Sequence, residues 1–152
     1  ACILLIDDHS TDDTVERARR LAGRKLSIVQ APHPGGVAAA RQAGLEAVQT
    51  PFAAWLDADD EWLAGRGNRL LAALRAGHDI AVDALDLYDG PTGCFLRKLE
   101  IADFLRREPV PMRLFERNYL PGDTQVGFRT RTFRKAGGYD SKFVVQKVLT
   151  LF

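Results

Sequence analysis

The first 60 residues alternate between apolar runs and stretches with helical spacing. Apolar runs at 3–6, 26–30 and 52–56 have the length of strands. Between them, apolar side chains recur every three or four positions over 15–22 and 37–48, which indicates helices. This order of strand, helix, strand, helix and strand is typical of a parallel α/β sheet.

The rest of the chain shows a weaker pattern. We expect helices over 69–76, 101–107 and 130–136, and strands over 79–87, 94–99 and 125–129. The turn residues of 89–93 predict that the strands before and after them pair as a hairpin. We find no internal repeat and no change of composition that would mark a domain boundary.

Acidic side chains directly follow the first and third predicted strands. Asp7 and Asp8 come after the first strand, and Asp57, Asp59 and Asp60 come after the third. If both strands belong to one parallel sheet, both clusters lie at its carboxyl edge, where open α/β sheets bind ligands. Carboxylates gathered there repel one another unless a cation neutralises them. A divalent cation that holds a phosphate group meets this need.

Each cluster also has a purely structural interpretation. Residues 57–61 would be a solvated acidic turn, and Asp8 would help to cap the helix that follows it. Ser10, with Asp13 three residues on, resembles a capping box for the same helix. In the functional interpretation, Asp8 accepts a hydrogen bond from a nucleobase or a ribose. Asp57 and Asp59 point the same way if the strand geometry continues to them.

The amino-acid composition narrows the classes of protein to which the chain can belong. The chain has 152 residues, 46% hydrophobic and 27% charged, which suits one globular domain. A net charge of +1 produces no strong positive electrostatic field that would attract nucleic acid. No apolar stretch reaches the roughly 20 residues that span a bilayer. Cys2 and Cys94 match no zinc or redox spacing, which predicts free thiols in a reducing compartment, the cytoplasm. We also expect both ends to be cuts through a longer protein.

Several segments, in matching order, resemble family 2 glycosyltransferases of the GT-A fold. Residues 6–14 resemble the segment VDDGSTDGT, and residues 36–45 are similar to the helix GVSAARNAGL. Residues 52–60 resemble YIAFLDSDD, which carries the DXD motif. Residues 126–129 with 133–140 resemble VLFRREVFEKVGGFD.

This resemblance covers nearly the whole chain and implies a mainly parallel α/β sheet flanked by helices. It implies one GT-A domain over 1–152, with a nucleotide-binding part over about 1–62 and an acceptor-side part over about 63–152. It further implies an enzyme that transfers a sugar, with inversion, from a UDP-sugar to a glycan, lipid or small-molecule acceptor. Mn²⁺ or Mg²⁺ would stabilise the leaving nucleoside diphosphate as a Lewis acid.

The resemblance also assigns roles to residues. Asp8 matches the family residue that contacts the base, and Asp59 matches the last Asp of the DXD motif, which binds the metal. Asp57 would lie near the ribose or the water shell of the metal. Asp7 would belong to the same nucleotide-sugar site. Arg41 would support the donor or the acidic cluster, or form a salt bridge on the helix surface.

The chain lacks the asparagine that the family usually has before the second helix, at 34–36, and two further departures bear on function. The first strand and loop of the family, which resemble VSVIIPVYN, are missing, and peripheral membrane association would come through such missing regions. The general base of the family lies in a Glu-Asp pair, which would fall at Gln146-Lys147. Neither residue readily takes a proton at neutral pH, so the catalytic base is not assigned. Asp123 and Asp140 are the nearby carboxylates.

Two other classes of protein compete with a transferase. A non-catalytic nucleotide-binding domain of the same fold would explain why Gln146-Lys147 stands where the family has its Glu-Asp pair. A response-regulator receiver would also place Asp7, Asp8 and Asp57 after its first and third strands. However, receivers carry a Met-Pro turn and a later Lys-Pro pair, and this chain has neither.

Overall fold

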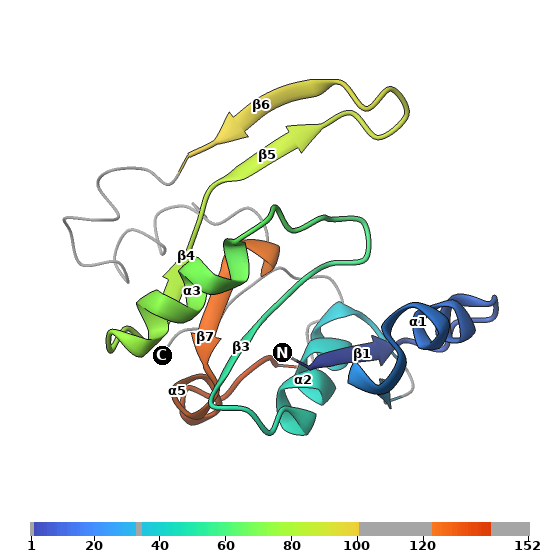
Figure 1. Cartoon of the computed structure of the whole chain (residues 1–152). Coiled ribbons are helices and arrows are strands. Elements are labelled where there is room, and N and C mark those ends of the chain that lie inside the picture. The colour runs from blue at the N-terminus through green and yellow to red at the C-terminus, as the bar shows by residue number, and fades with distance from the viewer. Residues whose placement is uncertain (1, 33–34, 101–122, 141–152) are drawn as a thin grey trace. The chain divides into compact units, whose positions relative to one another are not determined.

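The computed structural model describes residues 2–32, 35–100 and 123–140. The chain divides into two compact units, shown as ribbons in Figure 1. The first unit comprises residues 1–51 and 130–152, and the second comprises residues 52–129. Each unit has its own strands and helices and is described by itself.

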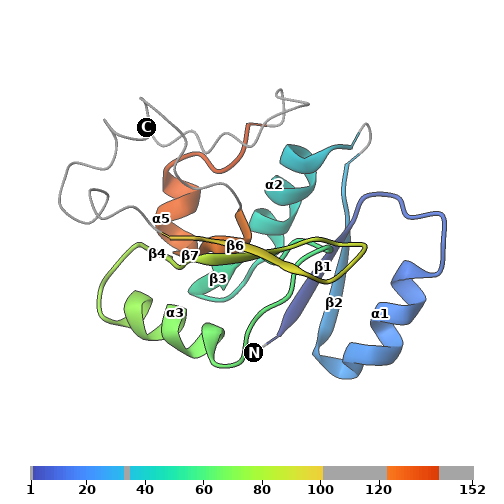
Figure 2. The ribbon, with the colours of Figure 1, turned by 90° about the horizontal axis from the view of Figure 1, so that it is seen from above.

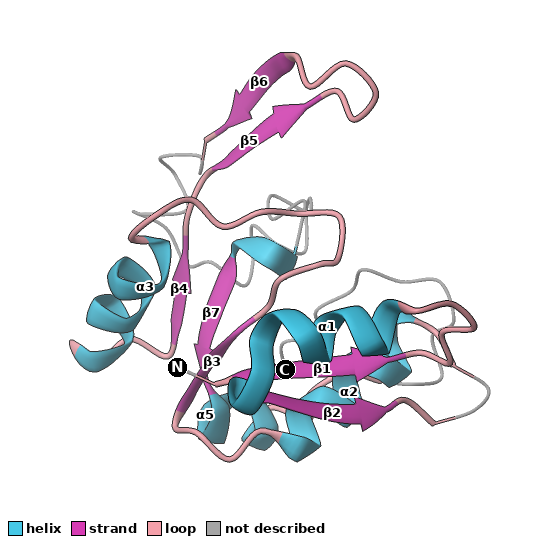
Figure 3. Cartoon of the chain, turned by 45° about the vertical axis from the view of Figure 1, so that its right-hand side comes forward, coloured by secondary structure: helices cyan, strands magenta, loops and turns pink. Residues whose placement is uncertain are grey.

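The first unit is built on a pair of parallel strands. β1 (Ile3–Asp7) pairs with β2 (Leu26–Gln30). α1 (Thr14–Ala22) connects the two strands through the short 3-10 helix Gly23–Lys25, and α2 (Val37–Ala47) follows β2. The two α-helices lie on opposite faces of the strand pair (Figure 2 and Figure 3). This arrangement confirms the elements that the apolar pattern predicts for the first third of the chain.

The carboxyl end of α2 is held by α5 (Thr130–Lys135) and by the residues after it. The Arg134 guanidinium donates to the carbonyl of Leu45, at 2.7 Å from Nη2, and to the carbonyl of Glu46, at 3.0 Å. The last carbonyls of a helix have no partner within the helix, so these bonds satisfy them. Beyond α5, the Tyr139 N–H donates to Gln42 Oε1 at 2.9 Å, which ties the chain to the middle of α2.

The second unit has a three-stranded antiparallel sheet. β7 (Val126–Arg129) lies between β3 (Phe52–Ala54) and β4 (Ile80–Val82). α3 (Arg66–Arg75) runs alongside β4 and β7 (Figure 1). A Cβ atom at Gly127 would come within 3.3 Å of Leu70 Cδ1, so this glycine lets α3 pack closely on β7. The small core includes the buried side chains of Leu70, Leu74 and Ala81.

The remaining strands of the second unit form a hairpin. β5 (Leu85–Tyr88) pairs with β6 (Phe95–Leu99), and the rings of Tyr88 and Phe95 meet edge-on at 5.6 Å. The predicted turn over 89–93 joins them and is stabilised by the Asp89 carboxylate, which accepts from the Thr92 N–H at 3.1 Å. A 3-10 helix over Asp123–Gln125 leads into β7. Within the described residues, none of the helices has the length and apolar character needed to cross a bilayer.

The mixed α/β class predicted from the sequence is confirmed, but the expected parallel pairing holds only for β1 with β2 among the described strands. β3 and β4 each pair with β7 antiparallel, and β5 pairs antiparallel with β6. The reason is that β7, which is far from β3 in the sequence, is the hydrogen-bonding neighbour of β3. An apolar run indicates that a strand exists but not which strand pairs with it.

Several element boundaries also differ from the prediction. β3 ends at Ala54, two residues before the end of the apolar run, and the predicted strand over 79–87 is interrupted at Asp83-Ala84. α3 begins at Arg66, three residues earlier than its apolar spacing indicates. The predicted helix over 101–107 lies outside the described residues.

We predict that Arg134→Ala lowers the free energy of unfolding by about 1–2 kcal/mol, because it leaves the carbonyls at the end of α2 without a charged donor. Urea denaturation followed by circular dichroism measures this loss. Arg131→Ala is the matched control, because Arg131 lies on the same helix, is exposed and has no partner among the described residues. Equal losses for the two variants would contradict the proposed role of Arg134.

Candidate functional site

The first acidic cluster forms the turn at the end of β1. Asp7 is the last residue of the strand, and only 9% of its surface is exposed. Its Oδ1 accepts from the Ser10 N–H at 3.1 Å. Hydrogen bonds from the Ser10 side chain and backbone hold the pKa of the Asp7 carboxyl below its usual value. Asp7 therefore stays ionised to lower pH than an unperturbed aspartate.

Ser10 does not form the predicted capping box. α1 begins at Thr14, and its N-cap residue Asp13 makes no capping hydrogen bond through its side chain. Asp12 Oδ1 instead accepts from the Thr14 N–H at 3.0 Å, and hydrogen bonds from Thr14 lower the pKa of Asp12. Ser10 is bound to Asp7, so it belongs to the turn rather than to the helix start.

Asp8 binds the start of α2 rather than the start of α1. Its Oδ2 accepts from the N–H of Gly36, the N-cap residue of α2, at 3.1 Å. A Cβ atom at Gly35 would clash with the Asp8 carboxylate, so the close approach requires a glycine there. The positive end of the α2 dipole also favours a negative charge in this place. The Asp8 carboxylate is thus held by the backbone of α2. Because Asp8 is exposed, the carboxylate also remains accessible to a ligand.

The residue after Asp8 adopts a backbone conformation that is uncommon for a side chain. His9 has a φ of +61°, the one positive value among the described residues other than glycine. The segment VDDGSTDGT, which this turn resembles, has glycine at the corresponding position. His9 thus adopts a φ that glycine adopts readily, at the position where the resembled segment has glycine.

The second acidic cluster forms a turn after β3. The Asp60 N–H donates to the Asp57 carbonyl at 3.1 Å, and the Asp57 N–H donates to the Thr124 hydroxyl oxygen at 3.1 Å. Asp57 is half-buried, whereas Asp59 is exposed and its carboxylate has no hydrogen-bond or ion-pair partner within the described residues. Trp55 lies between β3 and the turn, with its ring 5.8 Å from that of Phe128.

The donor atoms of this turn suit Mg²⁺ or Mn²⁺ only together with a ligand. Over the described ranges, the structure contains no group of three or more His, Cys, Asp or Glu side chains placed to hold a metal. Mg²⁺ is commonly bound by one or two carboxylates together with the phosphates of a substrate and several waters. Asp59, with Asp57 nearby in the same turn, supplies hard oxygen donors of this kind. The residues therefore fit a cation that arrives with a diphosphate.

The two acidic clusters belong to different units. Asp7 and Asp8 lie in the first unit, and Asp57 and Asp59 lie in the second. The structure brings together the members of each cluster, and the predicted convergence of the two clusters stays a prediction. Arg41 lies on α2 and is half-buried. Gln146-Lys147, at the expected position of the general base, lies outside the described residues.

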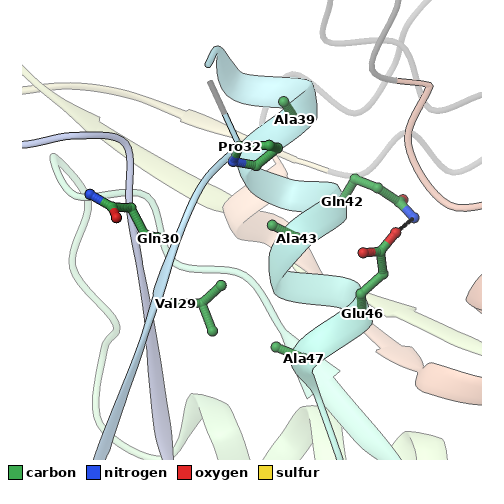
Figure 4. A pocket seen from close by; sticks show the side chains of 8 residues that line it. All are labelled: Val29, Gln30, Pro32, Ala39, Gln42, Ala43, Glu46 and Ala47. Atoms are coloured by element: carbon green, nitrogen blue, oxygen red, sulfur yellow. Dashed lines mark hydrogen bonds between the residues drawn. The ribbon is translucent and has the colours of Figure 1, made fainter. Parts of the chain in front are cut away.

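A groove of about 600 Å³ in the first unit contains none of the predicted site residues. Figure 4 shows it between β2 and α2, with Val29 and Pro32 on one side and small side chains of α2 on the other. Gln42 and Glu46 lie at its rim, joined by a hydrogen bond of 2.8 Å. Among the described residues, the one charged side chain that lines the groove is Glu46, whose negative charge would repel a phosphate.

Sequence reasoning missed the residues that support the acidic turns. Thr124 binds the backbone of Asp57, and Arg66 in turn binds Thr124 and Asp83. These residues are far apart in the sequence and show no periodicity, so no local signal could have identified them. Gly35 did have a signal, because a pair of glycines before a helix indicates a close approach of the backbone.

Comparison with known proteins assigns the chain to a family. The model of the family described as "Glycosyl transferase family 2" matches residues 2–136. An uncharacterized glycosyltransferase of Mycobacterium bovis (strain ATCC BAA-935 / AF2122/97) and one of Mycobacterium tuberculosis (strain ATCC 25618 / H37Rv) are each 39% identical to the chain over 77 residues. That match covers 51% of this chain and 34% of each relative.

The succinoglycan biosynthesis protein ExoU of Rhizobium meliloti (strain 1021) is 35% identical over 89 residues, which are 57% of this chain and 25% of ExoU. The chain therefore covers about a third of the length of the mycobacterial relatives and a quarter of that of ExoU. Because the family match includes most of its residues, the chain belongs to glycosyl transferase family 2, a family of transferase enzymes with the GT-A fold.

Proposed function

We propose that this protein transfers a sugar from a UDP-sugar to an acceptor, with inversion, and that it requires Mn²⁺ or Mg²⁺. The observation that carries the proposal is the turn after β3, where Asp59 is exposed in an Asp-Ala-Asp sequence that matches the DXD motif. Bound there, the cation would offset the negative charge that develops on the leaving UDP. The residues of the chain bind, orient and shield the donor.

The first unit would recognise the nucleoside. Asp8 is held by the Gly36 N–H through one oxygen, so its carboxylate has a defined position without being neutralised by that bond. A carboxylate accepts a hydrogen bond from the N–H of a uracil ring, and such a bond to a charged acceptor is stronger than one to a neutral acceptor. Asp7 shapes the turn from its buried position, and Arg41 of α2 would support the donor.

The second unit would hold the cation with Asp59, and Asp57 would lie near the ribose or the water shell. A half-buried Asp57 beside an exposed Asp59 agrees with this division of roles. The acceptor would be a glycan, since one relative is named for succinoglycan biosynthesis. A lipid or a small molecule would present the same hydroxyl nucleophile.

A non-catalytic nucleotide-binding protein is the second candidate. It is favoured by Gln146-Lys147, which stands where the family has an acidic pair. The two candidates differ in turnover of the donor. Incubation of the full-length protein with UDP-sugars, Mn²⁺ and polysaccharide acceptors would release UDP if the protein is a transferase, and tight binding without release of UDP would favour the second candidate.

We predict that Asp59→Ala removes the gain in UDP affinity that Mn²⁺ provides, a loss of about tenfold or more, because the cation loses its protein ligand. Isothermal titration calorimetry with UDP, in the presence and absence of Mn²⁺, measures this effect. Asp60→Ala is the control, because it removes an equal charge from the next residue of the same turn. An unchanged effect of Mn²⁺ in Asp59→Ala would remove the metal assignment.

We predict that Asp8→Asn weakens the binding of UDP without metal about tenfold, because the oxygen that would accept from the base is replaced by an amide nitrogen, which only donates. The amide oxygen can still accept from the Gly36 N–H, so the start of α2 is retained. Asp13→Asn removes the same charge from the same loop and should bind UDP as the wild type does. If the two variants bind UDP equally well, Asp8 does not contact the base.

A further inference from the structure

A buried arginine lies at the start of α3, where a positive charge is least expected. Arg66 is the first residue of the helix, and only 6% of its surface is exposed. The amino end of a helix carries a partial positive charge, which repels a cation. Removing a guanidinium from water is also unfavourable unless other groups replace the water. The surroundings of Arg66 must therefore compensate for both effects.

Three groups from different segments provide most of this compensation, whereas Nη1 is buried without a hydrogen-bond partner among the described residues. Asp83, just after β4, binds the guanidinium through both oxygens, at 2.9 Å from Nε to Oδ2 and 3.1 Å from Nη2 to Oδ1. The carbonyl of Thr124, just before β7, accepts a hydrogen bond from Nη2. The ring of Trp62 faces the guanidinium at 4.5 Å. Arg66 thus joins the start of α3 to the residues around both neighbouring strands.

Thr124 connects this cluster to the acidic turn. Its carbonyl is bound by Arg66, and its hydroxyl oxygen accepts from the Asp57 N–H at 3.1 Å. Thr124 is 2% exposed, so water cannot replace either bond easily. The Asp57 N–H is therefore bound to a residue whose carbonyl is in turn bound by the buried guanidinium.

The charge of Arg66 is neutralised by Asp83 and not by the acidic turn. If Arg66 paired with Asp57 or Asp59 directly, it would compete with a metal for their carboxylates. Binding through the neutral Thr124 fixes the backbone of the turn and leaves the exposed Asp59 carboxylate for a cation. We propose that Arg66, acting through Thr124, is a positioning residue for the metal-binding turn of residues 57–60. This inference rests on the proposed role of Asp59 as the metal ligand.

The opposite end of the same sheet offers a matched control. Arg129 binds the same kinds of groups: the carboxylate of Asp79 at 3.3 Å, the carbonyl of Leu74 at 2.8 Å and the ring of Phe52 at 5.0 Å. In the register of the sheet, Arg129 pairs with Phe52 at the start of β3, whereas the acidic turn follows the end of β3. A variant at Arg129 therefore loses similar interactions without touching the turn.

The test compares Mn²⁺ binding by full-length Arg66→Met and Arg129→Met, measured by calorimetry in the presence of saturating UDP. Arg66→Met should weaken Mn²⁺ binding about tenfold, as is typical when a group that orients a metal ligand is lost. Arg129→Met should lower the thermal midpoint while keeping the Mn²⁺ affinity within about twofold of the wild type. Equal changes of Mn²⁺ affinity in the two variants, or no change in Arg66→Met, would overturn the proposal.

A second pair of variants tests the hydrogen bond between Thr124 and the Asp57 turn without removing a buried charge. This pair tests the proposal if Arg66→Met does not fold. Thr124→Val removes the hydroxyl that binds the Asp57 N–H, and Thr124→Ser keeps it. Thr124→Val should weaken Mn²⁺ binding about tenfold, and Thr124→Ser should bind Mn²⁺ as the wild type does. Equal Mn²⁺ affinity of the valine and serine variants would overturn the proposal. By contrast, if Asp59→Ala binds Mn²⁺ with the same affinity as the wild type, the proposed function itself is overturned.

Discussion

An acidic turn can hold a cation only if the protein fixes its backbone without neutralising its carboxylates. The turn after β3 meets this constraint through an uncharged group, and the turn after β1 is held in a similar way. Asp8 is held by the Gly36 N–H, and the Asp57 backbone is held by the Thr124 hydroxyl. The nearby buried cation, Arg66, is paired with Asp83 instead. The Asp59 carboxylate is thereby kept for a cation, and the second oxygen of Asp8 for a hydrogen-bond donor.

Membership of glycosyl transferase family 2 gives these turns a chemical meaning. The receiver interpretation is wrong, because the family match extends over residues 2–136, including both acidic clusters and the strand β7. The two units carry different parts of the proposed chemistry: the turn that would read the nucleoside lies in the first, and the turn that would hold the cation lies in the second.

Much of the fold could be predicted from the sequence, because local patterns determine local elements. Apolar spacing located α1 and α2, and the turn residues over 89–93 marked a real chain reversal. The antiparallel sheet could not be predicted, because β7 pairs with strands more than 40 residues away, and apolar runs do not specify their partners. The support of the second turn was equally hidden: Arg66 and Thr124 are 58 positions apart, and neither belongs to a motif.

The central claim is that Asp59 binds a divalent cation and that Asp8 binds the base of UDP. A crystal structure of the full-length protein with UDP and Mn²⁺ tests this most directly. The account predicts an Asp59 oxygen in the coordination sphere of the metal, together with the diphosphate, and the Asp8 carboxylate at about 2.7–3.2 Å from a ring N–H of the base. A metal bound without Asp59, or a base bound away from Asp8, would contradict it.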